Sequence, residues 1–110
     1  MKNNKTYIVT GTPGGTTIIT SVYQTLLNLI DFSLSADDAV NKPKFHMQWL
    51  PDTIYMEDDF PEEIAAGMKK MGYTVDKRGK IGRTEVIRIL PDGTIEAVGD
   101  KRGDDTAAGY

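Results

Sequence analysis

The sequence predicts a small α+β domain, with α/β as the alternative that composition alone leaves open. Residues 16–31 carry apolar side chains at three- and four-residue spacing, which is typical of a helix of about four turns. Short segments rich in β-branched residues are typical of strands: residues 5–10, 53–57, 84–90 and 94–98. The chain has 110 residues, of which 39% are hydrophobic and 26% charged; this fits a single domain or a fragment, 1–110, and excludes a disordered chain.

A glycine-rich loop separates the first strand from the long helix. Residues 5–10 (KTYIVT) form the strand, and residues 11–15 (GTPGG) end it at once. The helix that follows has one broad apolar face, made of Ile18, Ile19, Val22, Tyr23, Leu26, Leu27, Leu29 and Ile30. Polar residues fall largely between these positions, so we expect the apolar stripe to be the side that needs a cover.

A short helix is predicted over residues 36–41. Ser35 and Asp38 have the spacing of a helix-capping pair, with Asp in place of Glu or Gln. Pro43 ends this helix, because the residue before a proline avoids helical backbone. Residues 44–50 (KFHMQWL) are then expected to be extended.

The remaining elements follow from turn and helix signals. Pro61 suits the first position of a second amphipathic helix, and Gly72 is the expected stop. A brief strand is predicted at residues 74–76, and a hairpin turns at residues 91–93 (PDG), where glycine tolerates a positive φ. Residues 100–110 are polar and resemble a tail.

Charge and composition exclude several function classes. Thirteen Lys and Arg against sixteen Asp and Glu give a net charge of −3 with no basic patch, so a nucleic-acid partner is not predicted. No apolar run approaches the roughly 20 residues of a membrane span. The absence of cysteine excludes disulfides and thiolate chemistry, and a single histidine, His46, excludes a multi-histidine metal site. No signal peptide is expected from residues 1–5, and the compartment stays open.

The loop at residues 11–15 is the strongest candidate for chemistry. It lies where free backbone N–H groups and the positive end of the helix dipole converge, which is a place that binds anions or stabilises an oxyanion. It lacks the Gly-Lys-Ser/Thr ending of a P-loop and does not fit G-x-G-x-x-G. The alternative is a tight strand-to-helix turn that needs small residues for steric reasons alone.

The other chemically distinctive residues favour structural interpretations. His46 has no acidic residue within three positions, so a packed or surface histidine is expected rather than a ligand. Residues 57–59 (EDD) with Glu62 and Glu63 are interpreted as a solvated helix start rather than a divalent-cation site. Trp49 is expected in the core, as is Tyr55. No serine has an evident base beside it, and neither a metal nor a cofactor is predicted.

Considered as a whole, the chain resembles the C-terminal part of the small subunit of γ-glutamyltranspeptidases (glutathione hydrolases). The resemblance covers about nine-tenths of the sequence. It rests on these stretches, in order: GTPGG with TTIITSVYQTLLNLID, NKPKFHMQWLPD, GRTEVIRILPDG and the terminal DDTAAGY.

The resemblance implies an N-terminal-nucleophile hydrolase fold, a four-layer α-β-β-α sandwich of antiparallel sheets and packed helices. Family members cleave γ-glutamyl amides such as glutathione and pass the γ-glutamyl group to water or to an amino acid or peptide through a threonine acyl-enzyme. Two adjacent glycines of the family motif donate N–H groups to the oxyanion. They match Gly14 and Gly15, and the resemblance places Gly15 against the substrate as well. Thr12 stands where the family often has serine.

The family's catalytic threonine lies many tens of residues before the glycine pair, whereas here thirteen residues precede Gly14. None of the early threonines has the free α-amino group that the mechanism uses as a base. We therefore expect no nucleophile in this chain and no activity from it alone. The expected partners are a segment or subunit that completes the site, or a second copy of the chain. The alternative function is a non-catalytic oligomerising or small-acid-binding module.

Overall fold

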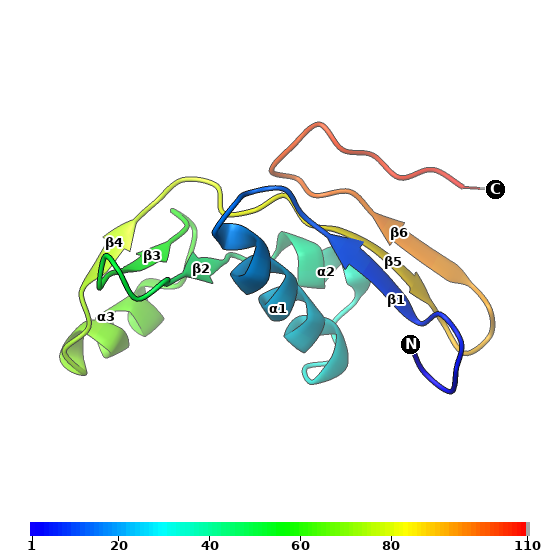
Figure 1. Ribbon diagram of the computed structural model, residues 1–110, viewed down its shortest axis with the longest axis horizontal. Coiled ribbons are helices and arrows are strands. Elements are labelled where there is room, and N and C mark those ends of the chain that lie inside the picture. Colours follow the sequence, from blue (N-terminus) through cyan, green and yellow to red (C-terminus); the bar gives the residue numbers. More distant parts are fainter. Residues whose placement is uncertain (110) are drawn as a thin grey trace.

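In the described part of the chain, residues 1–109, two three-stranded sheets lie at opposite ends of the molecule, with α1 and α2 near its middle (Figure 1). This computed structural model measures 47 × 29 × 24 Å. The sheet β1-β5-β6 is antiparallel and contains Ile8–Gly11, Glu85–Ile89 and Ile95–Val98. The sheet β2-β3-β4 contains Phe45–His46, Ile54–Met56 and Val75–Lys77. The helices are α1 (Thr17–Ile30), α2 (Ala36–Asn41) and α3 (Glu62–Lys70).

The α+β fold class is confirmed, because antiparallel strand pairs and packed helices make up the fold. Strand β2 pairs antiparallel with β3, and β3 pairs parallel with β4 across the α3 crossover. The local signals also hold. The Ser35 hydroxyl accepts the Asp38 N–H at 3.1 Å at the start of α2, and Gly72 ends α3 with a φ of 95°. Pro61 is the residue before α3 rather than its first residue.

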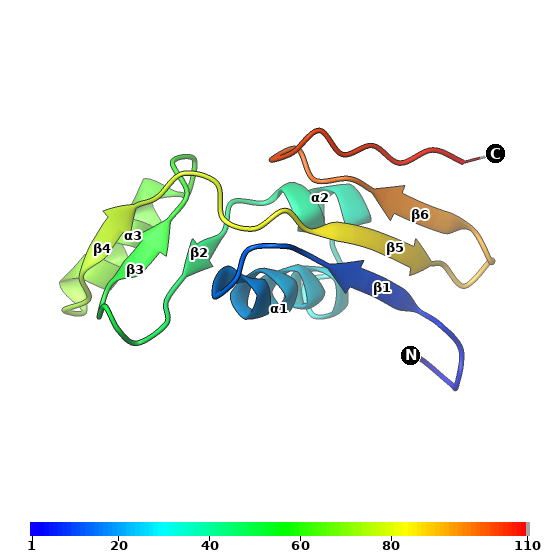
Figure 2. The same cartoon turned by 45° about the horizontal axis from the view of Figure 1, so that its top comes forward.

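One face of the β1-β5-β6 sheet carries the main core. Helix α1 lies along β1, and α2 lies along β5 and β6 (Figure 2). The core consists of Leu29, Ala36, Ala39, Val40 and Val86, against which Ile8, Leu34 and Val98 pack. Side chains alternate across a strand, so the opposite face of the sheet exposes Val9, Ile87 and Ile95.

The apolar stripe of α1 is largely uncovered within this chain, as expected of a face that needs a cover: Ile18, Ile19, Tyr23 and Ile30 are exposed, whereas Leu29 is buried in the main core. The residues that α1 buries are Thr17, Ser21, Thr25 and Leu29. Ile19 is 79% exposed and Tyr23 61% exposed. The small hydroxyl residues let α1 approach backbone closely: a Cβ at Gly82 would overlap the Ser21 side chain. Close approach therefore decides which side of α1 packs within this chain.

A second, smaller core lies under the β2-β3-β4 sheet. It consists of Ile54, Met56 and Ala65, with Phe45, Met47, Phe60, Met68 and Val75 around them. The expectation that Trp49 belongs to the core is wrong, since its side chain is 78% exposed. Trp49 lies in the segment after β2 and has a positive φ of 74°. Tyr55 is half-buried, with the Arg78 guanidinium 5.7 Å from its ring centre.

The segment after β6 is only partly a tail. It turns back on itself and runs beside β6 in both views (Figures 1 and 2). Asp100 is 0% exposed and Arg102 7% exposed, so the prediction of a polar tail is wrong at its start. Both side chains are charged, and their burial requires partners, which lie in the cluster described below. Among residues 1–109, no helix has the length and apolar character needed to cross a bilayer.

Candidate functional site

The loop at residues 11–15 connects β1 to the N-terminus of α1, as predicted. Gly14 has a φ of 138° and Gly15 a φ of 59°, values that favour glycine over residues with a Cβ. A Cβ on Gly14 would also overlap the Thr17 hydroxyl, whereas a Cβ on Gly15 would meet open space. Gly14 is therefore required because there is no space for a Cβ, whereas Gly15 is favoured only by its backbone conformation.

Among residues 1–109, the carbonyls of Pro13, Gly14 and Gly15 are occupied, whereas the amides of Gly14 and Gly15 have no acceptor. The Pro13 carbonyl accepts the Thr12 hydroxyl at 2.8 Å, and the Gly14 carbonyl accepts the Thr17 hydroxyl at 2.9 Å. Gly14 and Gly15 are exposed, and within residues 1–109 no acceptor meets either N–H. The first turn of α1 contains no acidic residue, so nothing local offsets the positive end of its dipole. The arrangement can therefore bind a negatively charged oxygen.

Residues 80–84, which we name the strap, contact the glycine loop through a hydrogen bond. The Arg83 N–H donates to the Thr12 hydroxyl at 2.7 Å. The strap is itself anchored by two buried carboxylates, because the Ile81 N–H donates to Glu57 at 2.8 Å and the Thr84 N–H donates to Asp100 at 2.6 Å. The glycine loop is thus connected through its neighbour to a buried charge cluster.

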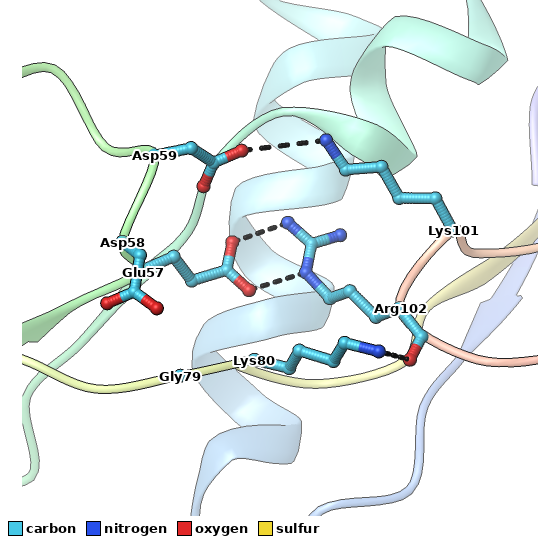
Figure 3. A pocket seen from close by; sticks show the side chains of 7 residues that line it. All are labelled: Glu57, Asp58, Asp59, Gly79, Lys80, Lys101 and Arg102. Atoms are coloured by element: carbon cyan, nitrogen blue, oxygen red, sulfur yellow. Dashed lines mark hydrogen bonds and ion pairs between the residues drawn. The ribbon is translucent and has the colours of Figure 1, made fainter.

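The centre of that cluster is a forked ion pair between Glu57 and Arg102 (Figure 3). The Arg102 Nε and one terminal nitrogen donate to the two Glu57 oxygens, each at 2.5 Å. The remaining donors reach Asp100 and the Val40 and Lys42 carbonyls. A guanidinium has five N–H donors, so every donor of Arg102 has an acceptor within this chain.

Burial and hydrogen bonding have opposite effects on the pKa of the Glu57 carboxyl. Burial alone would raise the pKa of this carboxyl, but hydrogen bonds from Arg102 and from the Ile81 and Lys44 amides outweigh it and bring the pKa below its usual range. Lys44 is also buried, and its Nζ donates to the Val40 carbonyl at 2.6 Å. Burial, with the nearby Arg102 charge, lowers the pKa of Lys44 to about 8.

Two hollows lie near these groups. One, of about 240 Å³, is lined by Glu57, Asp58, Asp59, Gly79, Lys80, Lys101 and Arg102 (Figure 3). Among its lining residues, Glu57 and Arg102 are already paired with each other, so these two side chains have little capacity left to bind a ligand. The other, of about 420 Å³, lies beside the glycine loop and is lined by Val9, Thr10, Gly11, Thr12, Pro13, Arg83, Glu85, Val86 and Ile87. The glycine loop with this second hollow is the candidate site.

The other residues singled out from the sequence have structural roles. His46 is buried, with Nδ1 2.8 Å from the Thr20 hydroxyl and Nε2 3.0 Å from the Gln48 amide oxygen, which confirms a packed histidine. Glu62 and Glu63 are exposed in the first turn of α3, as expected. Among residues 1–109, no group of three or more His, Asp or Glu side chains is placed to hold a metal.

Glu57 corrects the interpretation of the acidic run, because it is 4% exposed and belongs to the charge cluster rather than to a solvated helix start. Sequence reasoning also missed Asp100, Arg102 and Lys44. The available signal was weak: an arginine and an aspartate in a polar segment, whose partner Glu57 lies 45 residues before Arg102.

A family profile and two similar curated proteins point to the same protein family. The family profile for γ-glutamyltranspeptidase matches residues 1–110. The glutathione hydrolase proenzyme of Escherichia coli is 40% identical over 111 residues, which cover 100% of this chain and 19% of that protein. The corresponding proenzyme of Pseudomonas aeruginosa is 40% identical over 93% of this chain and 19% of its own length. The chain thus spans about a fifth of the length of these curated relatives.

Solved structures agree. The γ-glutamyltranspeptidase of Pseudomonas nitroreducens in complex with L-DON has a TM-score of 0.91 and 34% identity, covering 100% of this chain and 58% of that one. The Helicobacter pylori γ-glutamyltranspeptidase T380A mutant has a TM-score of 0.89 and 38% identity, covering 94% of this chain and 57% of the other. A cephalosporin acylase of Bacillus halodurans, 23% identical over 100% of this chain and 21% of its own, shares the fold with a TM-score of 0.91.

The resemblance seen in the sequence, the profile match along the whole chain and the superposition on solved enzymes all lead to one assignment. The fold is that of the C-terminal portion of an N-terminal-nucleophile hydrolase sandwich, and the chain belongs to the γ-glutamyltranspeptidase family.

Proposed function

We propose that this chain supplies the oxyanion-binding amides, Gly14 and Gly15, to a site that cleaves γ-glutamyl amides such as glutathione. The observation that carries the proposal is the pair of exposed N–H groups at the start of α1, which no acceptor among residues 1–109 meets. Two convergent amide donors stabilise the negative charge that develops on a carbonyl oxygen under attack. The names of the relatives supply the substrate class.

The nucleophile in this proposal comes from residues outside the 110. The threonines near the glycine loop are Thr6, Thr10, Thr12, Thr16 and Thr17, and each is inside the chain with its nitrogen in a peptide bond. An N-terminal threonine mechanism needs a free α-amine as its base. We therefore expect turnover only when another polypeptide segment or subunit completes the site.

The test is turnover of γ-glutamyl-p-nitroanilide by the purified chain, alone and mixed with a polypeptide that supplies the N-terminal segments of the relatives. Activity in the mixture alone supports the proposal. Activity of the chain alone contradicts the absence of a nucleophile. An associated but inactive mixture favours the alternative function, a non-catalytic oligomerising or small-acid-binding module.

A donor-removal variant tests the glycine pair within the active mixture. Gly15→Pro removes one N–H and is expected to lower turnover by about 100-fold or more. Proline also excludes the φ of 59° at this position. A semisynthetic chain with glycolate in place of Gly15 therefore serves as the sharper variant, since an ester removes the N–H without imposing the proline ring and otherwise only weakens the Gly14 carbonyl as an acceptor. Gly67→Ala in α3 is the matched control, because it lies outside the candidate site and a Cβ there meets no atom within 4 Å. Unchanged turnover in the folded glycolate variant would remove Gly15 from the role.

A further inference from the structure

Each glycine amide of the loop follows a carbonyl that a threonine hydroxyl holds. The Thr12 hydroxyl donates to the Pro13 carbonyl at 2.8 Å, and the next nitrogen along the chain is that of Gly14. The Thr17 hydroxyl donates to the Gly14 carbonyl at 2.9 Å, and the next nitrogen is that of Gly15. The two contacts therefore act on the two peptide groups that carry the candidate donors.

The geometry of the peptide group transmits these contacts to the amides. A peptide unit is planar and trans, so its C=O and its N–H point in opposite directions from the same rigid plane. When a hydroxyl holds the Pro13 carbonyl in one direction, the Gly14 N–H must point in the other. Glycine offers no Cβ to resist rotation of these planes, so the hydrogen bonds to the carbonyls supply much of the restraint on these two peptide groups.

The Thr12 hydroxyl has no rotational freedom left. It donates its hydrogen to the Pro13 carbonyl and accepts the Arg83 N–H at 2.7 Å, so both contacts determine the direction of its hydrogen. Arg83 belongs to the strap, whose neighbours Ile81 and Thr84 are held by the buried carboxylates. The buried charge cluster therefore fixes the strap, the strap fixes the Thr12 hydroxyl, and this hydroxyl sets the direction of the Gly14 N–H.

We propose that Thr12 and Thr17 are positioning residues: the Thr12 hydroxyl orients the Gly14 amide and the Thr17 hydroxyl orients the Gly15 amide. The catalytic part of this proposal rests on the proposed function, whereas the orienting part is a property of this chain alone. Thr12 has the larger effect, because the Gly14 carbonyl also accepts the Thr17 backbone N–H at 3.2 Å. Among the described residues, the Pro13 carbonyl accepts from the Thr12 hydroxyl alone.

The orienting part is tested by NMR on the ¹⁵N-labelled 110-residue chain. Thr12→Val and Thr17→Val remove a hydroxyl at nearly constant shape, and Thr12→Ser and Thr17→Ser keep it. The control is Thr25→Val, which removes a buried hydroxyl that has no partner among the described residues. Backbone order parameters and residual dipolar couplings of Gly14 and Gly15 are measured in each variant that retains native spectral dispersion. Thr12→Ala replaces Thr12→Val if the latter does not fold.

We expect the Gly14 order parameter to fall from near 0.85 to below about 0.6 in Thr12→Val, which is the range of flexible backbone. In Thr17→Val the change falls on Gly15 and is smaller. The serine variants retain the parent values, as does Thr25→Val. If the Gly14 order parameter and couplings in Thr12→Val match those of the parent chain, Thr12 does not orient this amide and the proposal is wrong.

The catalytic part is tested in the completed, active mixture. Thr12→Val is expected to lower kcat about 10-fold or more with little change in KM, because misdirected donors weaken transition-state binding. Thr12→Ser is expected to keep the parent kcat. If Thr12 acted through stability alone, folded Thr12→Val and folded Thr12→Ser chains would have the same kcat. A disordered Gly14 with unchanged kcat would overturn the catalytic part. If the parent mixture is inactive, the proposed function fails, and the NMR measurement still decides the orienting part.

Discussion

Arg102 holds both carboxylate oxygens of Glu57 through two N–H donors, each at 2.5 Å, across 45 residues of sequence. Glu57 follows β3 in the second sheet, and Arg102 follows β6 in the first. The pair is buried, with 4% and 6% of the two side chains exposed. It therefore joins the two sheets and, through the Ile81 N–H on Glu57, the strap as well.

Arg102→Met is predicted to lower the free energy of unfolding by about 3–5 kcal/mol, because it leaves the Glu57 charge buried without its partner. The measurement is urea denaturation followed by circular dichroism. The matched control is Lys77→Met, which removes an exposed pair with Glu62 at 3.4 Å and is expected to change stability by about 1 kcal/mol or less. Equal effects of the two substitutions would contradict a special role for the buried pair.

Stability is predicted to fall in acid through Glu57. Its pKa in the folded chain lies below the ordinary value of 4.5, so folding favours the ionised form. This contribution is complete above pH about 4.5 and is lost as the pH falls through the lower, folded-state pKa. Urea midpoints from pH 7 to pH 3 measure the loss. Glu57→Gln, where it folds, should flatten the acid limb, and an unchanged slope would assign the acid sensitivity to other carboxyls.

Stability is predicted to rise in mild alkali through Lys44. The folded chain lowers the pKa of this ammonium from 10.5 to about 8. Between these values the unfolded chain binds the proton and the folded chain does not, so stability increases with pH in that window, by on the order of 3 kcal/mol if fully expressed. Denaturation series from pH 7.5 to pH 10.5 should show the rise, and Lys44→Met should abolish it. A parent chain whose stability is flat over this window would contradict the prediction.

Self-association of the purified chain is predicted from its two uncovered apolar faces. Ile19 on α1 is 79% exposed, and Ile95 on the outer face of the first sheet is 63% exposed; apolar surfaces of this kind mark interaction sites. Sedimentation velocity should show oligomers at micromolar concentration, and Ile19→Lys or Ile95→Lys should reduce them. Thr94→Lys adds the same charge at an exposed polar position as a control. A monomer in all four samples would leave these faces without a role in association.

Sequence signals that act over a few residues were sufficient for the order of elements. The Ser35 cap, the glycine stop at Gly72 and the turn at residues 91–93 each depend on neighbours in the chain, and the structure places all three as expected. The glycine loop belongs to the same class, because a strand, a break and an amphipathic helix follow one another directly. Its position could therefore be predicted from local sequence.

Signals that depend on distant partners could not be found in this way. The hydropathy of α1 shows which side is apolar but not which side this chain covers, and the close approach of Gly82 selects the Ser21 side instead. Asp100 and Arg102 look like tail residues until their acceptors and donors are known. The contact between Arg83 and Thr12, 71 residues apart, likewise has no local signature.

The antiparallel register of β1 on β5 pairs Gly11 with Glu85 and Ile8 with Arg88. During synthesis, more than 70 further residues must be added after β1 before its partner β5 exists. At about 5–20 residues per second, this delay is about 4–15 s. Contacts of such long sequence separation also slow folding after release. The glycine loop follows β1 directly, so it cannot reach its final conformation until β1 has paired with β5. A nascent chain that stops before β5 would therefore carry this loop without its neighbouring strand.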